Sequence, residues 1–134
     1  MESNGDGGKN MSEEKTLLKF ETHLFGVKGN TEGIVKIPKD HYELTTERLK
    51  ITKQGIVTQK LSDIELYKVK DSSVKQTMKD KLMDIGNIEI ISSDESDPII
   101  VLKKIKNPHQ VREQIRNATK AAKEKAGVTY RHNI

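Results

Sequence analysis

The feature that most constrains the fold is a block of alternating apolar and polar residues that spans residues 42–102. A period of two residues is typical of a β-strand with one buried face. Segments 42–45 and 48–53 flank the turn Thr46-Glu47, and this arrangement predicts a β-hairpin. The apolar residues that share one face of the hairpin are Tyr42, Leu44, Leu49 and Ile51.

Further strands and one helix complete the expected fold. Asn107 and Pro108 suit a helix start, and Gly127 suits its end. Between them, apolar residues recur at helical spacing, at Val111, Ile115, Ala118 and Ala122. The other strand-like segments are residues 57–61, 64–67, 69–77, 87–92 and 99–103. We therefore expect a mainly β domain closed by one C-terminal helix. The residues expected to be buried together are Leu49, Ile51, Ile64, Leu66, Val69, Ile88, Ile90, Val111 and Ile115.

Polar stretches at both ends set the expected limits of the domain. Residues 1–14 are rich in Gly, Asn, Ser and acidic residues and are predicted to be a disordered tail, with Met11 as a second candidate start. The domain is expected over residues 15–126, beginning with a strand within residues 16–27. Residues 127–134 are predicted to be a frayed C-terminal tail.

Three connecting segments carry predictions of their own. Residues 26–33 contain three glycines and are expected to be a flexible loop. Residues 79–84 are expected to form a short helix over the sheet. The acidic residues at 94–97 are expected to form a charged, flexible loop without a specific metal, because the ligand spacing of an EF-hand is missing. The residues expected to anchor the short helix are Met78, Leu82 and Ile85.

Five short motifs follow one another in a characteristic order. They are Tyr42-x-Leu44-Thr45-x-x-Arg48-Leu49, Gly55-Ile56, Asp63-Ile64-Glu65-Leu66-x-x-Val69-Lys70-Asp71, Ile85-Gly86-x-Ile88-x-Ile90 and Ile105-x-Asn107-Pro108. Together, over residues 33–122, they resemble the bacterial pleckstrin-homology (PH-like) domains. The resemblance implies a PH-like bent antiparallel β-sandwich or barrel of about seven strands, capped by one C-terminal α-helix. Many members of this family are fused to transmembrane segments and have no assigned biochemical activity.

Basic residues around the first hairpin are the candidate ligand-binding residues. Arg48 and Lys50 alternate with Leu49 and Ile51, so their side chains are expected to face solvent. By resemblance to the lipid-binding PH domains of eukaryotes, such residues would contact the phosphates of an inositol lipid. The turn at residues 45–47 departs from that pattern because it is short and ends in Glu47. The candidate residues are Lys39, Arg48, Lys50, Lys53 and Lys60.

Other kinds of chemistry find little support in the sequence. The chain has no cysteine, its four histidines lie far apart, and no nucleophile motif occurs, so we expect no enzyme activity, no metal site and no cofactor. The net charge of +4 is modest, and no aromatic residues interleave with the basic ones. Since aromatic stacking platforms are typical of single-stranded nucleic acid binding, we expect no nucleic acid partner.

The function expected from these observations is that of a non-catalytic PH-like binding module, which contacts another protein through a sheet edge or a loop face. The alternative is peripheral binding of anionic phospholipid headgroups through the basic hairpin. In that case, changing Arg48 and Lys50 together to Glu would abolish binding without affecting the fold. A cytoplasmic location is expected, and the alternative function adds weak contact to the inner face of the membrane. The sequence identifies neither the partner nor the oligomeric state.

Overall fold

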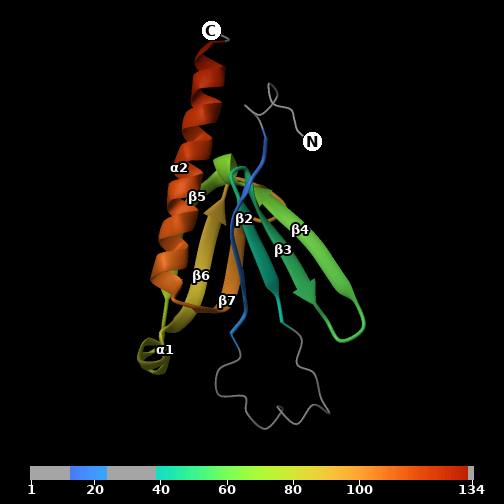
Figure 1. Cartoon of the computed structure of the whole chain (residues 1–134), viewed down its shortest axis with the longest axis vertical. Coiled ribbons are helices and arrows are strands. Elements are labelled where there is room, and N and C mark those ends of the chain that lie inside the picture. The colour runs from blue at the N-terminus through green and yellow to red at the C-terminus, as the bar shows by residue number, and fades with distance from the viewer. Residues whose placement is uncertain (1–12, 24–38, 133–134) are drawn as a thin grey trace, which may run out of the picture.

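Two antiparallel sheets and a long helix make up the structure (Figure 1). The computed structural model describes residues 13–23 and 39–132, with side chains up to Gly127. The four-stranded sheet has the order β1 (Thr16–Glu21), β2 (His41–Thr45), β3 (Arg48–Gln54) and β4 (Gln59–Glu65). The 3-10 turn Leu66–Lys68 leads to the three-stranded sheet of β5 (Val69–Lys75), β6 (Ile85–Ser92) and β7 (Ile99–Lys106). Helix α1 (Met78–Met83) joins β5 to β6, and helix α2 (Pro108–His132) follows β7. This arrangement confirms the predicted PH-like β-sandwich with one C-terminal helix.

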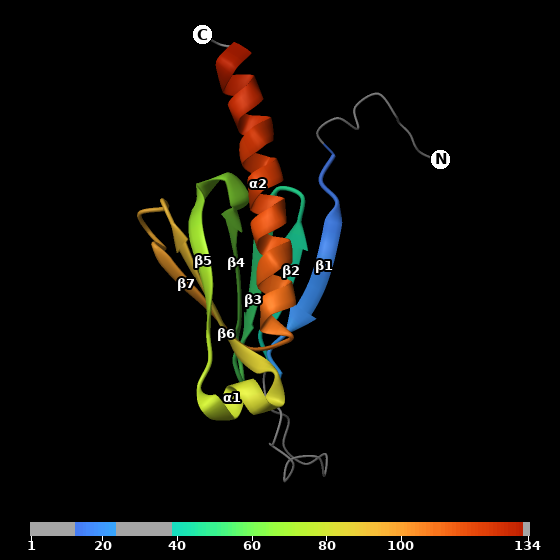
Figure 2. The same cartoon turned by 90° about the vertical axis from the view of Figure 1, so that its left-hand side faces the viewer.

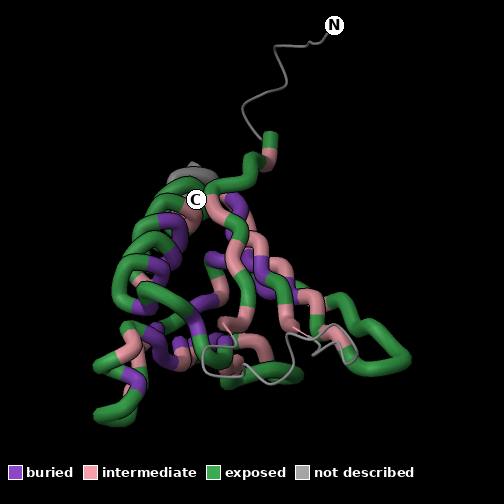
Figure 3. Tube along the Cα trace, turned by 60° about the horizontal axis from the view of Figure 1, so that its bottom comes forward, coloured by how far each residue is buried: buried purple, intermediate pink, exposed green. Residues whose placement is uncertain are grey.

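The core lies between the two sheets and under the first turns of α2 (Figure 3). All nine residues predicted to be buried together belong to this single cluster. The apolar residues that recur every second position in the strands therefore pack against those that recur every 3.6 positions in α2. Leu18 and Phe20 of β1 pack against the same cluster, and the Phe20 ring stacks on Tyr42 at a centroid distance of 5.1 Å.

Helix α2 closes the sandwich by packing on β5, β6 and the 3-10 turn (Figure 2). It begins at Pro108, as predicted, and Pro108 itself is buried. Asn107 has a left-handed backbone (φ 51°), and its carbonyl accepts the N–H of Val111 at 3.1 Å. The Arg112 guanidinium donates to the Ser72 carbonyl of β5 from both Nε and Nη2, at 3.1 and 2.8 Å. These contacts fix the helix against the edge of the three-stranded sheet.

Several element boundaries differ from the sequence prediction. Strands β5, β6 and β7 each differ from their predicted segments by two or three residues at one end. Residues 57–61 and 64–67 do not form separate strands, because β4 runs without a break through residues 59–65 along β3. Helix α2 also continues past Gly127 to His132, so this glycine does not end the helix. A glycine inside a helix costs only about 1 kcal/mol relative to alanine, which the neighbouring helical turns tolerate. The predicted loop at 26–33 and most of the predicted tail at 1–14 lie outside the described residues.

Helix α1 faces the opposite way to the prediction. Met78 and Leu82 were expected to anchor it over the sheet, but they are 79% and 89% exposed. The carboxylate of Asp80 points inward instead, and Asp80 is only 7% exposed. Of the three predicted anchors only Ile85, which starts β6, is buried. The predicted anchoring role of Met78 and Leu82 is therefore wrong.

Polar contacts of Asp80 explain this orientation. The Thr77 hydroxyl accepts the N–H of Asp80 at 3.0 Å, and the Asp80 carboxylate accepts the N–H of Thr77 at 3.2 Å. Lys104 Nζ of β7 donates to the other carboxylate oxygen at 3.3 Å. The backbone hydrogen bond from Thr77, helped by Lys104, holds the pKa of Asp80 below its usual value. Since helix positions turn by about 100° per residue, Met78 and Leu82 must point away from the side that Asp80 faces.

Candidate functional site

The outer face of the four-stranded sheet carries two rows of mostly polar side chains that cross all four strands. In the first row the strand register pairs Lys19 with Glu43, Glu43 with Lys50 and Lys50 with Asp63. Charges of opposite sign therefore alternate across the sheet, an arrangement that stabilises neighbouring strands. The second row consists of Glu21, His41, Thr52 and Leu61.

These rows line a shallow depression of about 730 Å³ on the sheet surface. Glu21 sits at one margin, where Lys39 Nζ lies 3.0 Å from one carboxylate oxygen and His41 Nδ1 lies 3.3 Å from the other. Leu61 lies at the opposite margin, on β4, and is 72% exposed. The depression thus combines cations, carboxylates and one exposed apolar side chain. Such a mixed surface matches a partner that offers both signs of charge better than one that is purely anionic.

Arg48 lies beside the first row and is held by two carboxylates. Its Nε lies 2.9 Å from Glu14 Oε2, its Nη2 donates to Glu14 Oε1 at 3.1 Å, and its Nη1 lies 3.2 Å from Asp63. The Thr45 hydroxyl donates to Glu14 at 2.6 Å. The hydrogen bond with Arg48 and then the bond from Thr45 lower the pKa of Glu14, and the same carboxylate raises the pKa of Arg48. Arg48 therefore ties the segment before β1 to β3.

The five candidate basic residues do not form one patch. Arg48 and Lys50 share the outer face with carboxylates, and Lys39 is paired with Glu21. Lys53 and Lys60 lie directly opposite each other at the far end of the β3–β4 hairpin. Because they alternate with the outer-facing residues, they project on the other face of the sheet. A role of all five in ligand binding stays a prediction, and the structure divides them between three places.

Reversing the charge of Arg48 and Lys50 is now expected to weaken the fold. In the variant Arg48→Glu/Lys50→Glu, the new carboxylates would face Glu14, Glu43 and Asp63, and like charges on neighbouring strands repel. We expect the midpoint of thermal unfolding, followed by circular dichroism at low salt, to fall by several degrees, since about 1 kcal/mol shifts the midpoint of a domain of this size by about 4 °C. The double exchange Lys120→Glu/Lys123→Glu on exposed helix positions is the control. An unchanged midpoint in the β3 variant would show that the ion pairs contribute nothing.

The free edge of β4 borders the depression. In the described part of the chain β4 pairs with β3 on one side and with no strand on the other. The other edges are partly covered: Arg112 binds the β5 carbonyl of Ser72, and the end of β1 is bridged to β7 by Thr22 and Ile105. An unpaired strand offers its backbone N–H and C=O groups to an added strand. Binding at this edge would use main-chain hydrogen bonds, with Leu61 beside the added strand.

Sequence reasoning missed a group of apolar residues at the end of the β3–β4 hairpin. Ile56 and Val57 are both 92% exposed in the turn, although residues 57–61 were expected to be a half-buried strand. The signal available in the sequence was Gly55, whose N–H donates to the Thr58 carbonyl at 2.8 Å and closes a tight turn. Residues inside so short a turn cannot reach the core.

The acidic loop between β6 and β7 is organised by its own hydrogen bonds. The Asp94 carboxylate accepts the N–H and the hydroxyl of Ser96, at 3.0 and 2.7 Å, and these bonds lower the pKa of Asp94. The Ser92 hydroxyl donates to the Asp97 carbonyl at 2.8 Å. No group of three or more His, Asp or Glu side chains able to hold a metal ion occurs among the residues described. None of the helices in the described ranges is both long and apolar enough to cross a membrane.

Comparison with known proteins gives one informative result. A protein-family model described as Bacterial PH domain matches residues 34–119, which is more than half of the 134 residues. This span begins before β2 and ends within α2, so it contains six of the seven strands, the core and the β4 edge. No curated protein and no solved structure matches the chain.

Proposed function

The chain belongs to the bacterial PH domain family, and we propose that it is a non-catalytic module that binds another protein at the β4 edge of the four-stranded sheet. The observation that carries this proposal is the open edge of β4 beside the depression, with Leu61 exposed at the junction. An extended segment of the partner would lie along β4 and extend the sheet by main-chain hydrogen bonds.

The charges of the depression support a protein partner rather than a lipid headgroup at this face. Each cation of the first row has a carboxylate as its cross-strand neighbour, so the local field is close to balanced. A phosphate entering the depression would meet Glu43 and Asp63 together with Lys50. A polypeptide can instead place basic and acidic side chains opposite the matching residues, which favours one partner over others.

The test compares the capture of proteins by the full chain and by two matched variants. Leu61→Asp places a charge at the junction of edge and depression, whereas Ile99→Asp makes the same kind of change on the three-stranded sheet, where Ile99 is 59% exposed. A protein retained by the unmodified chain and by Ile99→Asp, but lost with Leu61→Asp, is then purified. We expect its affinity for Leu61→Asp, measured by titration calorimetry, to be reduced at least about tenfold, because a buried apolar contact is replaced by a desolvated charge. A purified binder whose affinity is equal for both variants would contradict the assignment of the site.

A further inference from the structure

Two pairs of apolar side chains project into solvent at the same end of the molecule. Ile56 and Val57 form the turn of the β3–β4 hairpin, and Met78 and Leu82 lie on α1; all four are at least 79% exposed. Figures 1 and 2 show α1 and this end of the four-stranded sheet at the lower end of the fold, opposite the C-terminal part of α2. We infer that this end of the domain docks on an anionic lipid bilayer, with the two apolar pairs inserted at the level of the headgroups.

The hairpin turn carries positive charge as well as apolar residues. Residues 53–60 contain two lysines and no acidic residue. Lys53 and Lys60 are direct cross-strand neighbours, both are exposed, and neither forms an ion pair with a carboxylate among the described residues. Like charges placed directly opposite each other destabilise a hairpin. An anionic surface next to Ile56 and Val57 would relieve this repulsion.

Helix α1 also presents apolar residues next to lysines, as the hairpin turn does. Its outward side carries Met78 and Leu82, which are four positions apart and therefore neighbours on the helix surface. Lys79 and Lys81 flank them and are exposed, whereas Asp80 is turned inward to Thr77 and Lys104. The helix turns Asp80 inward and presents two apolar and two basic side chains to solvent, beside one exposed carboxylate at its C-cap, Asp84. Apolar insertion and positive charge are the two attractions that an anionic bilayer offers.

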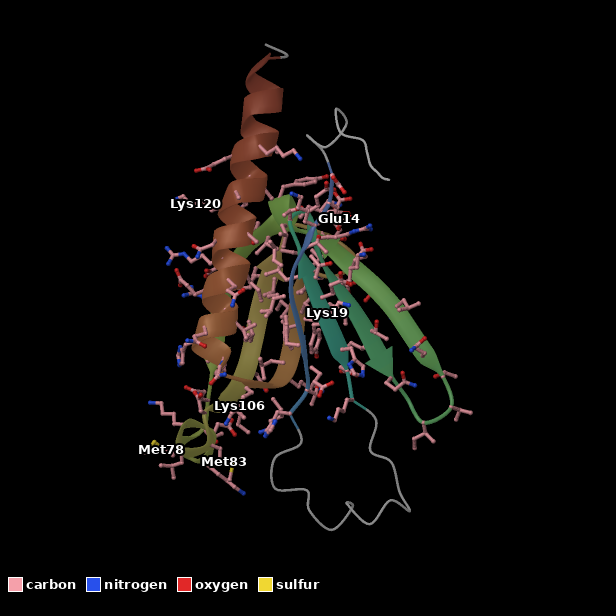
Figure 4. The ribbon with its side chains drawn as sticks, in the orientation of Figure 1. Glu14, Lys19, Met78, Met83, Lys106 and Lys120 are labelled. Carbon is pink, nitrogen blue, oxygen red and sulfur yellow. The ribbon has the colours of Figure 1, made fainter. Side chains whose placement is uncertain are left out.

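The arrangement as two separate projections favours a bilayer over a folded protein. A protein interface needs one continuous, closely packed apolar core, whereas a fluid bilayer accepts separate side chains without matching their shape. The lysines beside each projection complement anionic headgroups. In Figure 4 Met78, Met83 and Lys106 mark this end, well away from Lys120 near the middle of α2. The inferred surface is also distinct from the depression on the outer face of the four-stranded sheet.

The test measures sedimentation of the full chain with vesicles of phosphatidylcholine mixed with phosphatidylglycerol, and with vesicles of phosphatidylcholine alone. We expect binding to the anionic vesicles. Lys53→Gln/Lys60→Gln should reduce the partition coefficient about thirtyfold, because each basic residue near an anionic surface contributes about fivefold. Ile56→Thr/Val57→Thr and Met78→Gln/Leu82→Gln should each reduce it by about tenfold or more, because apolar groups no longer leave water.

Matched controls separate docking at this end from diffuse attraction. Lys120→Gln/Lys123→Gln removes the same charge from exposed positions of α2, and Leu61→Thr removes an exposed apolar side chain beside the depression. Both should leave vesicle binding within about twofold of the unmodified chain. The change at Lys53 and Lys60 has a second readout, since it relieves the like-charge pair and should raise the unfolding midpoint while it weakens vesicle binding. A variant with a damaged fold would instead show a lower unfolding midpoint together with weaker vesicle binding.

Three results would overturn the inference. One is that the unmodified chain fails to sediment with the anionic vesicles at low salt. Another is that the control pair on α2 loses as much binding as the hairpin lysines, which would mean diffuse attraction. The third is equal binding to vesicles with and without phosphatidylglycerol. Loss of vesicle binding with Leu61→Thr alone would point to the β4 edge instead, so failure here and failure of the proposed protein contact are distinguishable.

Discussion

Replacing Ile115 by alanine should lower the free energy of unfolding by about 3 kcal/mol, since truncating a buried isoleucine usually costs about 2–5 kcal/mol. Ile115 is fully buried in the single core cluster, at a position where α2 covers the sandwich. The change removes apolar contacts and leaves a cavity that the two sheets cannot fill without shifting. Urea unfolding measures the loss. It is followed by circular dichroism of the helix and the sheets, because the chain has no tryptophan for fluorescence.

The neighbouring exchange Gln114→Ala is the control for this prediction. Gln114 is exposed on the same helix, so its replacement should change the free energy of unfolding by less than about 0.5 kcal/mol. A loss below about 1 kcal/mol for Ile115→Ala would mean that α2 is only loosely attached to the sheets. It would also contradict the placement of the core between the sheets and the helix.

Replacing Gly86 by alanine should cost about 2 kcal/mol, although the added group is a single methyl. A Cβ at Gly86 would lie 2.7 Å from Gln76 Cγ, 3.2 Å from the Lys75 carbonyl oxygen and 3.3 Å from Pro108 Cγ. Moving the Gln76 side chain away would weaken or break the hydrogen bond that it donates to the Ile85 carbonyl at 2.8 Å. The backbone oxygen and the proline ring at the start of α2 have little room to move.

Gly127→Ala provides the matched control, because it is the same substitution in open space. A Cβ at Gly127 meets nothing within 4 Å, and alanine is favoured over glycine inside a helix by up to about 1 kcal/mol. The two variants should therefore shift the thermal midpoint in opposite directions. If Gly86→Ala leaves the midpoint unchanged, the close approach of β5, β6 and α2 at Gly86 is not maintained in solution.

The sequence predicted the parts of the fold that depend on local patterning. Alternation at Leu49 and Ile51 identified the first hairpin, and the stripe through Val111 and Ile115 identified α2 with its start at Pro108. Each of these patterns is carried by residues close together in the chain, and burial follows directly from the period. The family resemblance then ordered these pieces into two sheets.

The orientation of α1 could not be predicted in the same way. Met78 and Leu82 have the spacing of an inward-facing stripe, and hydrophobicity alone places them against the sheet. Their exposure depends on Asp80, whose inward direction is held by its two hydrogen bonds with Thr77 and by Lys104, a partner 24 residues along the chain. Lys104 itself has a left-handed backbone (φ 51°), where β7 departs from the regular register with β6. The capping bonds between Thr77 and Asp80, together with the long-range bond to Lys104, thus override a local apolar pattern.

The candidate surfaces were also only partly visible in the sequence. Arg48 and Lys50 were identified as outward-facing, but their neighbours Glu14 and Asp63 come from other segments. Alternation along one strand says which side a residue faces, and only the register between strands says which charge lies next to it. For this reason a hairpin that reads as basic in sequence is nearly neutral on the outer face of the sheet.

Helix α2 extends beyond the body of the domain, and this gives the molecule a direction. From Ala118, its last residue in the buried core cluster, the helix continues to His132, a length of about 20 Å at 1.5 Å per residue. It points away from the end that bears α1 and the hairpin turn (Figure 1). If that end rests on a membrane, the C-terminal turns of α2 extend away from the lipid surface. A fluorophore placed on its upper turns would then sit far from lipid-embedded quenchers, while one placed at the hairpin turn would lie among them.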